Sequence, residues 1–241
     1  MFQYASLMGI ADKNNCSGYA PLSNSILPQG FILGSVKDEP PSENQLLHTK
    51  QRFAFTPEYF KIHENFDMNV VDVNLCGYFQ TEKYFNHIQD RVKSDFEFKQ
   101  NIRDTCCDIF NQLDPSVPIV SLHVRRGDYL IIPDIHPTTT DEYYEQALNM
   151  FPEHNVMVFS DDISWCKEKF RGSKFIFPKA PSLFHDLCLM TMCSSSIIAN
   201  SSFSWWGAWL TNKEKVVAPK NWFGPSGPPS HDIYCDDWII I

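Results

Sequence analysis

The chain has 241 residues, of which 43% are hydrophobic and 14% aromatic, so it can bury the core of one large or two small domains. Its net charge of -9 argues against nucleic acid or an anionic membrane as the main partner, although a local basic pocket could still bind a nucleotide. The 8 cysteines show no Cys-x-x-Cys pair and no zinc-like spacing, a pattern typical of free thiols in a reducing compartment. The sequence has no run of about 18 apolar residues for a membrane span, and its first ten residues lack the basic start of a signal peptide.

The first half of the chain shows no clean hydrophobic period. Residues 35–45 form a polar stretch with a Pro-Pro pair, and residues 53–73 mix aromatic with charged side chains. We place a domain boundary near residue 114. The predicted organisation is a first domain over 1–114, a second over 115–228, and a C-terminal tail over 229–241 that can return to the first domain.

The second half alternates short apolar runs with helix-compatible stretches. The apolar runs are rich in β-branched or aromatic residues and cover 117–124, 155–160, 174–177, 195–200 and 215–219. The helix-compatible stretches between them cover 140–150, 162–170, 182–193 and 204–212. This alternation predicts βαβ units around a parallel sheet, that is, a Rossmann-like domain of the α/β class. Asp161 or Asp162 is expected to cap one helix, and Ser202 or Ser204 the last.

Polar residues follow three of these runs, at the points where the predicted strands end. Residues 123–128 follow the first run, residues 160–162 the second and residues 200–202 the fourth. Because ligands of open α/β sheets bind outside the carboxyl ends of the strands, we expect the three clusters to converge on one edge. Ser201 and Ser202 also lie where a helix begins, and its free N–H groups and dipole favour an anion there.

Two adjacent arginines at the end of the first run are the most informative pair in the chain. Arg125 and Arg126 stay protonated at physiological pH, and a guanidinium matches phosphate oxygens two at a time. Gly127 permits a tight turn or a close backbone approach beside them. These features predict a site for a phosphorylated ligand. One alternative is a surface arginine pair bridged to Asp128; another, an Arg-Gly-Asp adhesion ligand, does not suit the end of a core strand.

Other polar and aromatic residues have plainer interpretations. Asp161 and Asp162 can simply cap a helix, and a metal-binding pair is disfavoured because consecutive side chains diverge as they leave a strand. Trp205, Trp206 and Trp209 are expected to pack a helix on the sheet, with the first and last on one face. Stacking of one tryptophan on a sugar is the alternative.

Several segments together resemble the α1,2-fucosyltransferases that use GDP-fucose. The resemblance spans nearly the whole chain and is carried by VSLHVRRGDY at 120–129, FSDD at 159–162 and IIANSSFSWWGAWL at 197–210, with further matches at 1–5, 77–85, 218–220 and 222–223. It implies a GT-B architecture, in which two Rossmann-like domains with parallel sheets face each other across a cleft. It also implies inverting transfer of L-fucose from GDP-fucose to the 2-hydroxyl of a terminal galactose. Neither a metal nor a cofactor is implied.

The resemblance and the chemistry together give the catalytic assignments. Negative charge develops on the β-phosphate as GDP leaves, and Arg125 and Arg126 are expected to stabilise it, with Arg125 as the main phosphate clamp. The motif does not fix the base that removes the acceptor's proton. Asp128 is the first candidate, on sequence position alone.

The same resemblance assigns residues to the donor substrate. His123 is expected near the nucleotide and Asp161 on the guanine edge. Ser201 and Ser202 are expected to hold the diphosphate at the helix N-terminus, with Asn200 assisting. The expected partners are GDP-fucose and a galactose-terminated glycan, in carbohydrate metabolism or protein glycosylation. The expected location is the cytoplasm for a bacterial chain, or the Golgi membrane for a eukaryotic relative without its anchor.

One departure from the family lies at the amino terminus. Members normally begin with a strand and a Gly-Gly-Leu-Gly-Asn-Gln turn, whereas this chain begins directly with the helix that follows them. We therefore expect an incomplete first domain and an uncovered apolar helix face at Phe2, Leu7 and Ile10. The alternative function is a truncated, non-catalytic GDP-sugar-binding protein. A glycoside hydrolase is a more remote alternative, because the adjacent carboxylates Asp161 and Asp162 cannot flank a bond from opposite sides.

Overall fold

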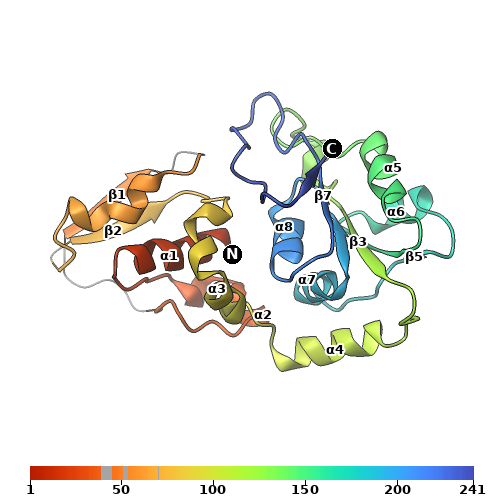
Figure 1. Cartoon of the computed structure of the whole chain (residues 1–241), viewed down its shortest axis with the longest axis horizontal. Coiled ribbons are helices and arrows are strands. Elements are labelled where there is room, and N and C mark those ends of the chain that lie inside the picture. The colour runs from red at the N-terminus through yellow and green to blue at the C-terminus, as the bar shows by residue number, and fades with distance from the viewer. Residues whose placement is uncertain (39–44, 51–53, 70) are drawn as a thin grey trace. The chain divides into compact units, whose positions relative to one another are not determined.

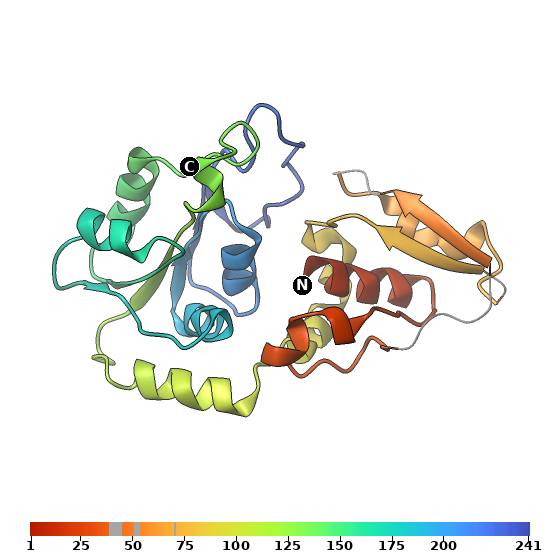
Figure 2. The same cartoon turned by 180° about the vertical axis from the view of Figure 1, so that it is seen from behind.

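The computed structural model describes residues 1–38, 45–50, 54–69 and 71–241. Contacts divide the chain into two compact units (Figures 1 and 2). The first unit comprises residues 1–99 and 229–235, and the second comprises residues 100–228 and 236–241. Most of the predicted polar stretch around residue 40 lies outside the described residues. None of the helices within the described ranges is both long and apolar enough to cross a membrane.

A six-stranded parallel sheet forms the centre of the second unit. In the order β5-β4-β3-β6-β7-β8, its strands are Phe175–Ile176, Asn155–Ser160, Ile119–Val124, Ser195–Ile197, Val216–Ala218 and Ile239–Ile240. The helices α5, α6, α7 and α8 are Asp141–Asn149, Ile163–Lys169, Leu183–Met192 and Ser202–Trp209. The predicted alternation and the α/β class are confirmed. The short strand β8 has no counterpart in the predicted pattern.

Helices cover both faces of this sheet. Figures 1 and 2 show α5 and α6 on one side and α7 and α8 on the other. Every residue of β3 is buried, as expected for a parallel strand covered on both faces. Val120, Leu122 and Val124 pack in one core with Tyr144 of α5 and with Phe170. Because β4 lies on one side of β3 and β6 on the other, the strand order reverses between β3 and β6, where α/β sheets bind ligands.

Side chains cap two helices that follow strands β4 and β6 at the carboxyl edge of the sheet. Asp162 precedes α6 and accepts a hydrogen bond from Trp165 N, which confirms one of the two expected caps. Ser201 precedes α8 and accepts a hydrogen bond from Phe203 N at 3.3 Å. The expected cap, Ser202 or Ser204, is therefore wrong, because the helix already includes Ser202.

Two segments group differently from the predicted domains. Helix α4 (Gln100–Phe110) belongs to the second unit rather than the first, because it packs on α7, where Cys106 Sγ donates to His185 O at 3.4 Å. Residues 229–235 belong to the first unit. There the Asp232 carboxylate pairs with Lys83 and accepts a hydrogen bond from Phe55 N.

The first unit is built around α1 (Phe2–Lys13). Its other elements are short: η1 Leu22–Asn24, α2 Leu27–Gly30, β1 Gln45–Lys50, η2 Pro57–Glu64, β2 Val71–Cys76, η3 Glu82–Tyr84, η4 Asn86–Ile88 and α3 Gln89–Asp95, with β1 and β2 parallel. Helix α1 packs so closely on η3 that a Cβ atom at Gly9 would lie 1.9 Å from Tyr84 O. Phe2 and Ile10 are only 5% and 3% exposed, and Phe85 lies against Phe2. The expected uncovered helix face is therefore wrong at these two positions.

Asp95, the last residue of α3, ties distant segments of the first unit together. It is 7% exposed, and its carboxylate accepts hydrogen bonds from Tyr4 OH at 2.5 Å and from both Ser35 N and Ser35 Oγ at 2.8 Å. Burial, and then the bond to Asp95, raises the pKa of Tyr4, so the phenol stays protonated and remains a donor. Asp95 therefore has the environment of a structural carboxylate.

Candidate active site at the carboxyl edge of the sheet

The turns after β3, β4 and β6 lie at the same edge of the sheet, because parallel strands end on one side. Hydrogen bonds join them. Arg126 N, after β3, donates to Asp161 Oδ1, after β4, at 3.0 Å. Tyr129 OH, also after β3, donates to the carbonyl of Asn200, after β6, at 2.9 Å. The structure thus brings together the three polar clusters that the sequence places at strand ends.

Arg125 lies directly after β3 at the centre of this edge. Its guanidinium pairs with Asp128 at 2.6 Å and with Asp161 at 3.2 Å, and lies 5.5 Å from the centre of the Tyr129 ring. The arginine side chain is 34% exposed and that of Asp128 is 56% exposed. The result is a solvent-accessible cation whose present partners are carboxylate oxygens. Phosphate oxygens bind a guanidinium with the same geometry, so a phosphate group could replace Asp128.

Arg126 has a different environment although it is the next residue. Its Nε pairs with Asp162 at 3.1 Å, and its guanidinium lies over the Trp165 ring at 4.0 Å. The side chain is 21% exposed. These contacts hold the turn after β3 against the start of α6. In this structure the Arg126 guanidinium is therefore paired with Asp162 and has a structural role.

Position 127 requires a glycine because the backbone there lies close to the Asp161 carboxylate. A Cβ atom at this position would lie 2.5 Å from Asp161 Oδ2, the oxygen that faces Arg125. Any other residue would therefore have to displace the carboxylate. The close backbone approach predicted for this glycine is confirmed.

His123, within β3, is a buried histidine without a hydrogen-bond partner at Nδ1 among the described residues. It is 5% exposed, and its ring lies 5.5 Å from that of Phe203. Burial first, and the charge of Arg125 second, lower its pKa to about 3. The ring is therefore neutral at physiological pH, and its Nδ1 is a buried polar atom without a partner among the described residues.

The three residues after β6 differ in exposure and in partners. Asn200 is 1% exposed; its Nδ2 donates to Pro137 O at 2.8 Å and Trp222 O at 3.0 Å, and its Oδ1 has no partner among the described residues. Asn200 thus fastens two loops to the sheet edge. Ser201 is 7% exposed and caps α8, whereas Ser202, the first residue of that helix, is exposed. The free N–H groups of this first turn favour an anion.

Two aromatic residues of the site were missed by sequence reasoning. The guanidinium of Arg125 lies over the Tyr129 ring, and that of Arg126 lies over the Trp165 ring. Tyr129 ends the motif that contains both arginines, and Trp165 falls in the first turn of a helix that begins at the same edge, so a weak signal existed for each. The tryptophans of α8 follow the packing prediction: Trp205, Trp206 and Trp209 are 0%, 2% and 7% exposed, and the rings of the first and last are stacked.

The arrangement suits electrostatic chemistry on a phosphate ester. It combines an accessible guanidinium, exposed carboxylates, a neutral buried imidazole and a helix N-terminus at one edge. In the described ranges we find no group of three His, Cys, Asp or Glu side chains with the spacing of a metal site.

Comparison with known sequences matches residues 1–241 to "Glycosyl transferase family 11". The O-antigen biosynthesis glycosyltransferase WbnK of Escherichia coli is 31% identical over 69% of this chain and 60% of its own length. An alpha-1,2-colitosyltransferase of Escherichia coli is 31% identical over 100% of this chain and 94% of its own. The galactoside alpha-(1,2)-fucosyltransferase 1 of Lagothrix lagotricha is 25% identical over 90% of this chain and 63% of its own. The chain thus spans less than two thirds of the length of WbnK and of the Lagothrix lagotricha enzyme.

Solved structures with the same fold include the fucosyltransferase NodZ from Bradyrhizobium, with a TM-score of 0.53 at 14% identity over 87% of this chain and 88% of that one. A NodZ crystal form grown with GDP gives a TM-score of 0.54 at 15% identity, covering 87% of each chain. At this identity the likeness concerns the fold alone, and it confirms a GT-B-like α/β fold with parallel sheets. Since the family match covers every residue, the chain belongs to glycosyltransferase family 11.

Proposed function

We propose that this chain transfers L-fucose from GDP-fucose to the 2-hydroxyl of a terminal galactose, with inversion at the fucose carbon. The observation that carries the proposal is Arg125, an accessible cation flanked by Asp128 and Asp161 at the point where the strand order reverses. The relative named as a galactoside alpha-(1,2)-fucosyltransferase supports the sugar and the linkage.

The proposed reaction uses Arg125 at the leaving group. The acceptor oxygen attacks the anomeric carbon of fucose, the bond from that carbon to the β-phosphate oxygen breaks, and GDP leaves with the electron pair. Arg125 stabilises the charge that develops on the phosphate. When the phosphate takes Arg125, Asp128 loses its ion pair and becomes free to accept the proton of the acceptor hydroxyl. Its 56% exposed side chain suits this role.

The remaining residues are assigned to the nucleotide and its phosphates. His123 offers a neutral ring with an unpartnered nitrogen to the nucleotide. Asp161 accepts hydrogen bonds from the guanine edge; each of its oxygens has one partner in the structure, and a carboxylate has about four acceptor sites. Ser201 and Ser202 present the N-terminus of α8 to the diphosphate.

Arg126 and Asn200 act through their neighbours in this proposal. The Arg126 side chain holds Asp162 and Trp165, so it positions the turn that carries Asp161. The side-chain amide of Asn200 donates hydrogen bonds to the carbonyl oxygens of Pro137 and Trp222. Both residues therefore serve the site by keeping its loops in place.

A second candidate donor is GDP-colitose, because a relative covered over 94% of its own length is an alpha-1,2-colitosyltransferase. Colitose is fucose without its 3-hydroxyl group. A site that hydrogen-bonds this hydroxyl would reject the deoxy sugar strongly, whereas an apolar site would separate the two sugars poorly. Side-by-side rates with the two donors decide between them.

The test combines a melting assay with a transfer assay. GDP at about a hundredfold excess over Kd should stabilise the chain by roughly 2.7 kcal/mol, and GDP-fucose with lactose should yield a fucosylated product. Arg125→Ala should weaken both effects. Arg171→Ala, an exposed arginine that bonds only the Glu168 carbonyl in the described structure, should change neither. Binding without transfer would favour the non-catalytic alternative. No stabilisation of a folded sample by GDP would overturn the assignment of the site.

A further inference from the structure

Two buried cysteines lie against each other where α4 packs on α7. Cys106 of α4 is 0% exposed and Cys188 of α7 is 4% exposed. Their side chains are joined by a hydrogen bond, and the Cys106 thiol also donates to His185 O, one turn before Cys188, at 3.4 Å. Both sulfur atoms therefore lie side by side between the two helices, which is the first requirement for a disulfide bond.

Helix α4 is held to the second unit by a narrow contact. Its buried residues are Ile102 and Cys106, whereas residues 101, 104, 107 and 108 are exposed. Figures 1 and 2 show the helix at the outside of this unit. A surface element with few buried apolar contacts opens locally at a lower free-energy cost than the core strands do. Local opening of α4 therefore gives a small oxidant access to both thiols.

The two thiols differ in acidity. The hydrogen bond with Cys188 lowers the pKa of Cys106, whereas the same bond, together with burial, raises the pKa of Cys188. Cys106 is therefore the first of the two to form a thiolate, which is the form of cysteine that reacts with oxidants. Cys188 stays protonated until Cys106 has reacted and then supplies the second sulfur atom.

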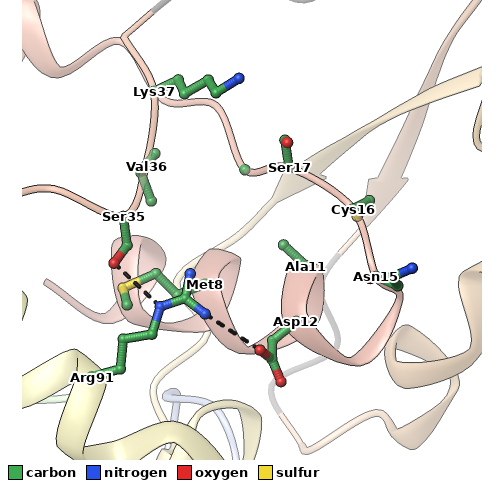
Figure 3. A pocket seen from close by; sticks show the side chains of 11 residues that line it. Met8, Ala11, Asp12, Asn15, Cys16, Ser17, Ser35, Val36, Lys37 and Arg91 are labelled. Atoms are coloured by element: carbon green, nitrogen blue, oxygen red, sulfur yellow. Dashed lines mark hydrogen bonds and ion pairs between the residues drawn. The ribbon is translucent and has the colours of Figure 1, made fainter.

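Other free cysteines of the chain have different surroundings. Cys166 and Cys193 are buried, and their hydrogen-bond partners are the Ser160 side chain and Leu189 O. In the first unit, Cys16 is exposed at the wall of a hollow beside α1 (Figure 3). These cysteines are therefore matched controls for the pair between α4 and α7, two for burial and one for exposure.

We propose that Cys106 and Cys188 form a redox-sensitive site, which hydrogen peroxide converts to a disulfide bond between α4 and α7. The Cys106 thiolate attacks one peroxide oxygen, the O–O bond breaks, and the released hydroxide takes up a proton to become water. The sulfur of Cys188 then attacks that of the Cys106 sulfenic acid, the S–O bond breaks, and a second water leaves with the Cys188 proton. The two sulfur atoms are oxidised by two electrons in total, and the peroxide is reduced to two water molecules.

The bond would enclose much of the second unit. The chain between the two cysteines contains β3 and β4, and Arg125 and Asp161 directly follow these strands. Closing a long loop removes freedom from the unfolded chain and thereby stabilises the folded one. The proposal goes beyond the transfer reaction and requires neither nucleotide nor sugar. Its outcome is therefore independent of whether the chain transfers fucose.

Mass spectrometry of the full chain tests the bond directly. The reduced protein is exposed to hydrogen peroxide in molar excess, unfolded in the presence of N-ethylmaleimide, and digested without reduction. We expect a linked pair of peptides that contains Cys106 and Cys188 and that dithiothreitol separates. Cys166 and Cys193 should still be alkylated by the maleimide. Absence of the linked peptides after Cys16 has been oxidised would overturn the proposal.

Serine variants identify the two sulfur atoms, because Cys107 and Cys193 lie close to the pair in sequence. Cys106→Ser and Cys188→Ser should each abolish the linked peptides. The matched variants Cys107→Ser and Cys193→Ser should each leave them unchanged. A linked pair that survives Cys106→Ser, or one that is lost in Cys107→Ser, would overturn the assignment of the bond.

Urea unfolding tests the consequence for stability. All six tryptophans of the chain lie in the second unit, so their fluorescence follows its unfolding. The urea midpoint of the peroxide-treated wild type should be about 1 M higher than that of the reduced protein. Treated Cys107→Ser should show the same shift, and treated Cys106→Ser should show none. A linked protein with an unchanged midpoint would overturn the stabilising role of the bond.

Discussion

In the second unit, Arg125 and Asp161 each lie directly after the end of a parallel strand. The Asp161 carboxylate, which pairs with Arg125, can accept further hydrogen bonds. In the first unit, Asp95 collects its partners Tyr4 and Ser35 from 91 and 60 residues away, and it is 7% exposed. The first arrangement leaves accessible charge at a sheet edge, and the second uses its charge to hold segments together. Variants in the two units should therefore change different quantities: ligand binding and turnover in one, stability in the other.

The largest effect is expected for Arg125. Arg125→Ala should lower the rate of transfer to lactose by about 10²–10³, because a contact to the leaving phosphate is lost in the transition state. Arg125→Lys should recover little of this, since the ammonium keeps the charge but loses the planar fork. Steady-state rates with saturating GDP-fucose measure the change. If Arg125→Ala transfers fucose at the wild-type rate, Arg125 is a structural arginine, and the two units do not differ in the way described.

Asp95 tests the other side of the comparison. Asp95→Ala leaves the buried Tyr4 hydroxyl without its acceptor, so the free energy of unfolding should fall by about 1–3 kcal/mol. Urea unfolding measures this, with Asp90→Ala, an exposed acidic residue on the same helix, as control. GDP affinity of the folded protein should not change. A fall in GDP affinity alongside stability would contradict the separation of the two units' roles.

A variant at Gly127 tests whether the position of the Asp161 carboxylate matters for ligand binding in the second unit. Gly127→Ala places a Cβ atom 2.5 Å from Asp161 Oδ2, so the carboxylate must move away from Arg125. Steric overpacking of this kind costs about 1–3 kcal/mol, and we expect it mainly as weaker GDP binding, measured by calorimetry. The matched control is Gly34→Ala, where a Cβ atom would meet nothing within 4 Å. Unaltered GDP binding by Gly127→Ala would show that the Asp161 position is not needed.

The effect that is smallest at physiological pH is expected from the titration of His123. Its pKa is about 3 in the folded chain and 6.5 when unfolded, so below pH 6.5 the unfolded chain binds the extra proton. The stability that the buried neutral ring contributes is fully present above pH 6.5 and is lost as pH falls toward 3. Each pH unit in this window costs about 1.4 kcal/mol at most.

Urea unfolding at several pH values measures this contribution. His123→Gln should flatten the decline of stability between pH 6.5 and 4.5, whereas His231→Gln, whose side chain is 66% exposed, should not. Identical pH slopes for the wild type and His123→Gln would mean that the ring is not held neutral by the fold.

Much of the second unit could be predicted because its pattern is local. Apolar runs that alternate with helix-compatible stretches mark the strands β3 to β7, and strand ends in a parallel sheet share one edge. The positions of the clusters around Arg125, Asp161 and Ser201 follow from that rule. The stacking of Trp205 on Trp209 follows equally from their spacing along a helix.

The first unit could not be predicted because its sequence has no regular hydrophobic pattern and its contacts join distant segments. Gly9 against Tyr84 and Asp95 against Tyr4 join segments more than 70 residues apart, and neither pair carries a signal in its neighbours. The burial of Phe2 and Ile10 could not be foreseen for the same reason. Helix α4 is a related case, since only its packing on α7 assigns it to the second unit.

The sequence by itself determined the parallel α/β class, the strand ends and the concentration of charge after β3. Only the tertiary structure decided how Arg125 and Arg126 divide their roles, with one facing Asp128 and Asp161 and the other held by Asp162 and Trp165. The physical reason is that secondary structure depends on neighbours along the chain, whereas the environment of a charged side chain depends on what packs beside it. That packing is set by the turns after β4 and β6 and by the helices they begin, which the local sequence around residue 125 does not contain.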